Sequence, residues 1–423
     1  MLQTVARGVS HYFDTTFHSL KNRNFRYFWS GQCVSLVGTT MQRTAQYWLV
    51  YQLTQSPFAV GMLGVAQFLP MLLFSLPVGA LLKRIPKRTL ILVTQTLFMA
   101  QALALAVLTH TGTAQYWHIL VLSAVYGVTQ TFDMPARQTF LYDLVGRGDI
   151  LNAVSLNSTI VNLSKIFGPA VAGLVMQAFG IPMCFLLNAL SFLAVLGSLL
   201  LIRVPQTPRE DTRTPLWQEV GDGLRFIRSR GALVACILVF AVVSTFALNL
   251  DVIAPVFAQG VLGRGAQGYT GLLTAAGAGS LAGALVMASR SRHGARGYLL
   301  IAGGAATAVF QIATVLSSSY AVSVALLAMM GFANIVFLNT ANAFFQTNTP
   351  DEYRTRVMSI YSLLLFGSTP IGNFFAGLVM QHIPGDSGFV VCGGITLLLL
   401  VPVLFFQRGI IRGWLCGAHK RGV

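Results

Sequence analysis

The stretch Ala172-Gly-Leu-Val-Met-Gln177 occurs a second time, unchanged, as Ala376-Gly-Leu-Val-Met-Gln381. The two copies lie 204 positions apart, and the same spacing relates Gly79-Ala-Leu81 to Gly283-Ala-Leu285. A spacing of about half of the 423 residues indicates two homologous halves. Parallel repeats of this kind build membrane transporters whose substrate site lies between the halves.

The composition indicates an integral membrane protein. Charged residues make up only 9% of the chain, against roughly 25% in a soluble protein. A spanning helix needs about 20 largely apolar residues. Twelve such stretches predict an all-α protein of two pseudo-symmetric six-helix bundles: Tyr27–Leu53, Ala59–Leu82, Thr89–Thr109, Trp117–Phe140, Leu151–Phe179, Met183–Ile202, Ala232–Ala258, Gly268–Ala288, Tyr298–Leu316, Tyr320–Phe345, Val357–Gln381 and Gly388–Phe406.

The basic residues predict the orientation. With the N-terminus inside, 24 of the 28 Lys and Arg fall in cytoplasmic segments, so we expect both termini in the cytoplasm and a multi-pass protein of the cell (inner) membrane. The proline-rich, charged segment before residue 230 predicts a linker, whose amphipathic run Leu216–Ile227 lies along the membrane surface. The expected domains are a segment 1–25, a bundle 26–203, a linker 204–230, a bundle 231–407 and a tail 408–423.

Several function classes are disfavoured. Most of the cations behind the net charge of +16 lie in cytoplasmic segments, which indicates topology and contact with anionic lipids rather than nucleic acid. The five cysteines and seven histidines show no disulfide or metal-ligand spacing, and no phosphate-binding glycine loop is present. We therefore expect no enzyme, no cofactor, no metal and no ATP-driven pump.

Motifs spread from residue 22 to about 380 resemble one branch of the major facilitator superfamily. They are Asn22–Gln32, Trp48–Tyr51, Asp133–Gln138, Gly168–Gly173, Asn188–Phe192 and Pro350–Arg356. This branch contains the enterobactin exporter, the transmembrane secretion effectors and macrolide efflux proteins. The resemblance implies a monomeric exporter working by proton antiport, and it leaves siderophores and drug-like compounds both open as cargo.

The loop after the second helix departs from the superfamily pattern. The residues Gly79, Lys83, Arg84, Lys87 and Arg88 occupy the motif, and Lys83 stands where relatives carry an aspartate. A lysine is unsuited to a helix N-terminus, whose dipole is positive. Either another acid replaces that aspartate or the contact is weaker; alternatively, the four cations only anchor the loop in the cytoplasm.

Gly168, Pro169 and Gly173 resemble an antiporter signature on the fifth helix, with Ala172 in place of one glycine. Proline bends a membrane helix and small residues let helices approach closely. The motif predicts either a hinge that favours export or close packing alone.

Charged residues inside the bilayer are the sharpest functional candidates. Asp133 and Arg137 lie four residues apart near the cytoplasmic end of the fourth helix, which favours a cytoplasmic gate network with the loop after helix 2 or, alternatively, a local ion pair. The superfamily resemblance places helices 1 and 7 face to face. Arg43 and Asp251 are then expected to pair across the halves on the outer side, unless Arg43 contacts backbone carbonyls and Asp251 is solvated.

Polar side chains at helical spacing predict the substrate cavity. Helix 1 presents Gln42 and Gln46, and helix 5 presents Lys165 near mid-membrane. Helix 10 presents Asn339 and Asn342, with Asn334 about one and a half turns earlier. A cavity lysine favours an anionic or catechol-like cargo if it is charged, and is a proton site if it is neutral. We expect an exporter whose partners are a small molecule, protons and lipids. An uptake carrier, a lipid flippase and a non-transporting scaffold remain as alternatives.

Overall fold

The computed structural model describes residues 17–81, 85–202, 216–289, 296–316, 318–383 and 387–410, and these form helices and their connections. The helices are η1 (His18–Lys21), α2 (Arg23–Thr54), α3 (Pro57–Leu81), α4 (Lys87–His110), α5 (Tyr116–Phe179), α6 (Ile181–Leu201), α7 (Leu216–Ser229), α8 (Gly231–Phe246), α9 (Leu250–Gly260), α10 (Gly265–Ser289), α11 (Gly297–Ala313), η3 (Thr314–Leu316), α12 (Tyr320–Thr347), α13 (Asp351–His382) and α14 (Ser387–Phe406).

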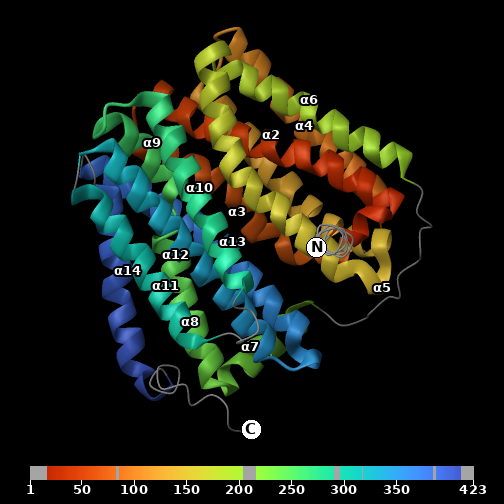
Figure 1. The fold of residues 1–423 in the computed structure, drawn as a ribbon, viewed down its shortest axis with the longest axis vertical. Helices are drawn as coiled ribbons and strands as arrows, with labels where there is room; N and C mark the ends of the chain where they lie inside the picture. The colour runs from red at the N-terminus through yellow and green to blue at the C-terminus, as the bar shows by residue number, and fades with distance from the viewer. Residues whose placement is uncertain are drawn as a thin grey trace, which may run out of the picture.

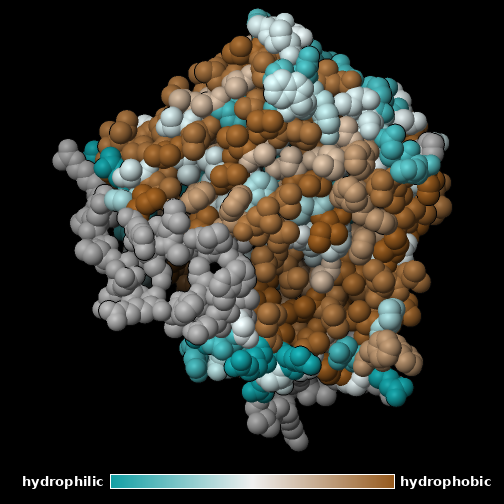
Figure 2. All heavy atoms as spheres, turned by 180° about the vertical axis from the view of Figure 1, so that it is seen from behind, coloured by the Kyte–Doolittle hydropathy of each residue, from teal (hydrophilic) through white to brown (hydrophobic). Residues whose placement is uncertain are grey.

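The surface has the hydrophobic band of a protein embedded in lipid. Large apolar side chains are exposed along many helices, among them Leu174, Leu398 and Phe406. Figure 2 shows hydrophobic residues over most of one face, with hydrophilic residues gathered toward its ends. Ten segments in the described ranges are long and apolar enough to cross a membrane. Together with the more polar α2 and the first part of α5, they are consistent with twelve crossings.

Two connections differ from the sequence expectation. The fourth and fifth predicted helices run into one another as the 64-residue α5, which bends at Gly146. Gly146 has φ 71°, a conformation that favours glycine, so the turn needs no intervening loop. The seventh predicted helix is instead interrupted: α8 ends at Phe246 and α9 begins at Leu250.

The helices fall into two groups, α2–α6 and α8–α14, which lie on opposite sides of the molecule in Figure 1. At one end a single hydrophobic core contains residues of both groups, including Tyr47, Leu63, Ile253 and Tyr269; we call it the joined core and this end the joined side. At the other end, the split side, the described cores belong to one group each. Phe28 lies in one of them and Phe345 in the other.

The two repeat copies lie at the contacts between the groups. Gly173 of α5 faces α10, where an added Cβ would lie 2.5 Å from the Thr270 hydroxyl oxygen. Gly377 of α13 faces α3, where an added Cβ would lie 3.0 Å from the Cα of Gly61. The repeated small residues therefore let two helix pairs approach closely across the halves.

The amphipathic run before the second bundle forms α7, which packs on the split side of α13. Phe226 stacks on Tyr353 with ring centroids 4.5 Å apart, and Asp222 lies 3.5 Å from the Arg356 guanidinium. Ile227 is buried in the core of the second group. These contacts attach α7 to the second group of helices.

Candidate functional site

A pocket of about 190 Å³ lies between the two groups of helices. It is built from α2 and α5 of the first group and from the α8–α9 break, α10 and α12 of the second. Its charged residues are Arg43, Lys165 and Asp251. The rest of its lining is Thr40, Thr44, Pro169, Ala247, Leu248, Leu250, Leu273, Ala276, Gly277, Ser280, Met330, Gly331, Asn334 and Ile335.

One ion pair crosses the pocket. Arg43 Nε lies 3.7 Å from Asp251 Oδ2, so α2 and α9 are connected through charged side chains. The two side chains are 35% and 33% exposed, which means that water screens part of their attraction. Asp251 lies in the first turn of α9, where the positive end of the helix dipole favours a carboxylate. The break before α9 is thus what places this acid at a helix start.

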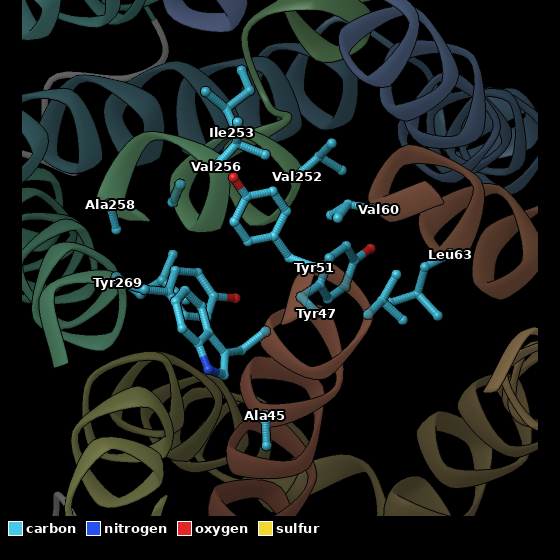
Figure 3. Close-up of a cluster of buried hydrophobic side chains, with 14 of the residues drawn as sticks. Ala45, Tyr47, Tyr51, Val60, Leu63, Val252, Ile253, Val256, Ala258 and Tyr269 are labelled. Carbon is cyan, nitrogen blue, oxygen red and sulfur yellow. The ribbon is translucent and has the colours of Figure 1, made fainter. Parts of the chain in front are cut away.

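Aromatic side chains close the joined side next to this pair. Trp48 of α2 stacks on Tyr269 of α10, with ring centroids 5.9 Å apart and planes 20° apart. Tyr47 and Tyr269 are buried, and their hydroxyls have no hydrogen-bond partner among the described residues. Figure 3 shows Tyr51 extending toward the α9 side chains Val252 and Val256, with Tyr47 on the side of Leu63 and Tyr269 on the opposite side. Nothing in the sequence indicated Tyr269 as the stacking partner of Trp48.

Lys165 of α5 lines the pocket with Arg43 and Asp251. Its backbone carbonyl faces α10, where a Cβ on Gly277 would lie 2.4 Å from that oxygen. The side chain is half-buried and makes no hydrogen bond or ion pair with any residue in the described ranges. Lys165 thus lies at the pocket between the two groups of helices, and its role toward a substrate stays a prediction.

Gln42 and Gln46 were expected to face the cavity, but they are not among the residues that line this pocket. Gln42 donates to Gln101 Oε1 at 2.9 Å and accepts from Asn188 at 2.8 Å, while Gln46 donates to Ser123 Oγ at 2.6 Å. All three partners belong to the first group of helices, and both glutamines are buried. These hydrogen bonds hold both glutamines inside the bundle, and the neighbouring face of α2 carries the pocket residues Thr40, Arg43 and Thr44.

Of the α12 asparagines expected to face the cavity, Asn334 is the one that lines the pocket. Asn339 is exposed, and Asn342 accepts a hydrogen bond from Gln346 at 2.5 Å. The pocket therefore meets α12 nearer its middle, and Asn339 and Asn342 lie farther toward the split side.

Asp133 lies in a buried polar cluster of the first group. Its carboxylate pairs with Arg137 and accepts hydrogen bonds from Thr94 at 2.6 Å and Gln95 at 2.9 Å, both on α4. These partners all lie in the first group of helices. This arrangement matches the expected alternative, in which Asp133 and Arg137 form a local ion pair rather than part of a gate network. The residues Lys83 and Arg84 of the expected gate network lie outside the described residues.

Two cations of the loop motif hold helix ends together. Lys87 pairs with Asp143 of α5, and Arg88 Nε donates to the Leu199 carbonyl at 2.9 Å, near the end of α6. Gly79 is helical in α3. Asp143 is thus an acid that contacts this loop from within the same half.

The glycine–proline motif is a site of close packing in this conformation. A Cβ on Gly168 would lie 2.0 Å from the Thr40 hydroxyl of α2, and α5 keeps helical backbone angles at Pro169. Pro169 itself lines the pocket. The motif therefore brings α5 against α2 beside Arg43, and Gly173 does the same against α10.

Comparisons with known proteins agree with this architecture. The pattern of the family described as "Transmembrane secretion effector" matches residues 14–411. The Staphyloferrin A transporter of Staphylococcus aureus is 23% identical, over 90% of this chain and 96% of its own length. Macrolide efflux protein A of Streptococcus pyogenes is 21% identical, over 90% and 94%. The crystal structure of a POT family transporter in complex with 5-aminolevulinic acid superimposes with a TM-score of 0.74 at 10% identity, covering 92% of this chain and 97% of its own.

A family match over nearly the whole chain, two groups of membrane helices and a charged pocket between them lead to one conclusion. The chain belongs to the transmembrane secretion effector family of the major facilitator superfamily and is a multi-pass membrane transporter.

Proposed function

We propose that this protein exports a small organic molecule across the cell membrane by alternating access, with its split side facing the cytoplasm. The basic residues support this orientation, because α7, Lys87 and Arg88 all lie at the split side. In the observed conformation the joined core closes the outer side. The domains then act as two bodies, residues 26–203 and 231–407, that rock about the pocket.

Export is supported by the relatives and by the family description. A macrolide efflux protein and a siderophore transporter are both similar to this chain over 90% of its length. Siderophores and drug-like compounds are therefore the two cargo classes to test first.

Proton antiport is supported by the Arg43–Asp251 pair, which is the observation that carries this proposal. The pair joins the two halves next to the joined core. Protonation of Asp251 removes its negative charge and with it the attraction to Arg43. The protonated form of Asp251 therefore no longer holds the halves together on the joined side, and the deprotonated form does.

The test is cargo-driven proton movement in proteoliposomes with a pH-sensitive dye inside. Erythromycin and staphyloferrin A serve as the two probes. We expect one of them to dissipate an imposed pH gradient through the wild-type protein, and Asp251→Asn to abolish this signal while leaving the protein folded.

Asp351→Asn is the matched control, since Asp351 is an exposed acid at the start of α13 that pairs with Arg354 three residues away. It should behave as wild type. Proton movement that persists in Asp251→Asn would exclude this carboxylate as the coupling acid. Cargo accumulation inside whole cells would reverse the proposed direction.

A further inference from the structure

The hydrogen-bonding groups of the pocket are unequally used. Three lining hydroxyls donate to backbone carbonyls: Thr40 to Ser164 at 2.9 Å, Thr44 to Thr40 at 3.0 Å and Ser280 to Gly331 at 3.1 Å. A hydroxyl has a single proton to donate. These groups therefore offer only acceptor lone pairs to a bound molecule.

The unused groups of the pocket are mostly donors. Lys165 makes no hydrogen bond or ion pair with any described residue, and the same holds for the Asn334 side chain. Arg43 meets Asp251 through Nε, which leaves its terminal nitrogens for other partners. A lysine ammonium carries three protons and no acceptor, so this set matches a ligand with several acceptor atoms.

The charges of the pocket point the same way. The pocket lining contains two cations, Arg43 and Lys165, and one acid, Asp251, so positive charge is in excess by one. A charge in membrane-embedded protein is expensive unless it meets a partner. Asp251 is the one acid in the lining of this pocket and cannot neutralise both cations, so an anionic ligand would balance the remaining charge.

The size of the pocket limits how much of a ligand it holds. Its volume of about 190 Å³ is below the roughly 300–1,000 Å³ of pockets that enclose drug-sized ligands. Leu273, Met330 and Ile335 supply an apolar wall. The space suits a small anion or the anionic end of a larger molecule, with its apolar part against this wall.

We propose that this pocket is a subsite for the anionic end of the cargo, with a carboxylate or comparable oxyanion held by Lys165 and Asn334. The inference rests on the proposed transport function and adds the chemical class of the substrate to it. The Arg43–Asp251 pair remains intact while the anion binds, because Lys165 supplies the compensating charge.

The test is a matched pair of probes, salicylate and salicylamide, which share a ring and hydroxyl and differ in charge. Binding to the full-length protein in phosphatidylcholine nanodiscs is measured by calorimetry at pH 7.5 without any gradient. We expect salicylate to bind at least about ten-fold more tightly, because charge-assisted hydrogen bonds are roughly twice as strong as neutral ones. Lys165→Gln should reduce this ratio to about one, and Lys165→Arg should preserve it.

Arg264→Gln is the control, since Arg264 is an exposed cation on the joined side, stacked on Tyr320. It should keep the wild-type ratio. Equal binding of the two probes to the wild-type protein, or a preference that survives in Lys165→Gln, would overturn the anion subsite. A lysine that only supports the fold would lower the melting temperature of Lys165→Gln and leave the ratio unchanged.

The source of the anion is distinguished by adding phosphatidylglycerol to the nanodiscs. Unchanged salicylate binding supports a soluble cargo, whereas competition keeps the anion subsite and assigns it to a lipid phosphate. Because binding is measured without a gradient, failure of proton antiport leaves this result intact. Conversely, proton-coupled flux without anion preference would refute the subsite alone.

Discussion

The two ends of the molecule are held in different ways. On the joined side, α3 meets α13 through backbone-close contacts, and a Cβ on Gly61 would lie 2.5 Å from the Asn373 carbonyl oxygen. Ser56 also donates to Gln381 across the halves at 2.7 Å. On the split side, the described cores and the Lys87–Asp143 pair each belong to one half. Contacts between halves are thus concentrated where the conformation is closed, and contacts within halves preserve each body.

The largest effect is expected from a methyl group placed in the joined-side contact. In Gly61→Ala the new Cβ meets a backbone carbonyl, which no side-chain rotation relieves. Overpacking of about 1–3 kcal/mol would multiply the population open at the joined side by roughly 5- to 150-fold. The readout is labelling of Ala276→Cys by an impermeant maleimide from outside the cell, in a cysteine-free background.

Gly394→Ala in α14 is its control, because a Cβ there meets nothing within 4 Å. If Gly61→Ala and Gly394→Ala label at the same rate, close glycine packing is not what closes this side.

The next largest effect concerns the ion pair. Breaking a fully buried pair costs about 3–5 kcal/mol, and exposed pairs contribute less than about 1 kcal/mol. Because Arg43 and Asp251 are each about one third exposed, we expect about 1–2 kcal/mol from Arg43→Ala or Asp251→Ala. Both variants should raise the same outside labelling.

The double variant sharpens this test, since directly coupled residues are non-additive. Arg43→Ala with Asp251→Ala should cost clearly less than the sum of the two. Additive costs would mean that each residue acts through other contacts.

A smaller effect is expected from the aromatic contact between the halves. Trp48→Leu removes the stack on Tyr269, which contributes about 0.5–1.5 kcal/mol beyond the area that it buries. Labelling should rise by less than in Gly61→Ala. Trp117→Leu, at a tryptophan that is 56% exposed, should leave labelling at the wild-type rate; an equal rise in both would point to a general loss of folding.

The smallest effect on labelling from outside is expected from a change at the split side. Asp143→Asn removes the pair with Lys87, whose side chains are 24% and 19% exposed, and should lower the free energy of unfolding by about 1 kcal/mol. Labelling from outside should not change, because both residues belong to one half. An altered labelling rate would show that contacts within a half also set the conformational equilibrium.

Much of the architecture follows from local sequence properties. Hydropathy located the membrane segments because each must be about 20 residues long and largely apolar, whatever its neighbours are. The repeat of Ala172–Gln177 at Ala376–Gln381 indicated two halves, and its glycines lie at the contacts between them. The rarity of charges in membrane helices identified Arg43, Lys165 and Asp251, which line one pocket.

The directions of individual side chains depended on packing between helices. Gln42 and Arg43 are adjacent, yet one step along a helix turns the side chain by about 100°, and only the positions of α4 and α6 show that Gln42 faces inward. Packing between helices also decides that Asn334 rather than Asn339 lines the pocket. It likewise decides that a break places Asp251 at the start of α9, and that Tyr269 lies opposite Trp48. Composition and periodicity describe one helix at a time, whereas the face that meets the cavity is set by which other helices cover the remaining faces.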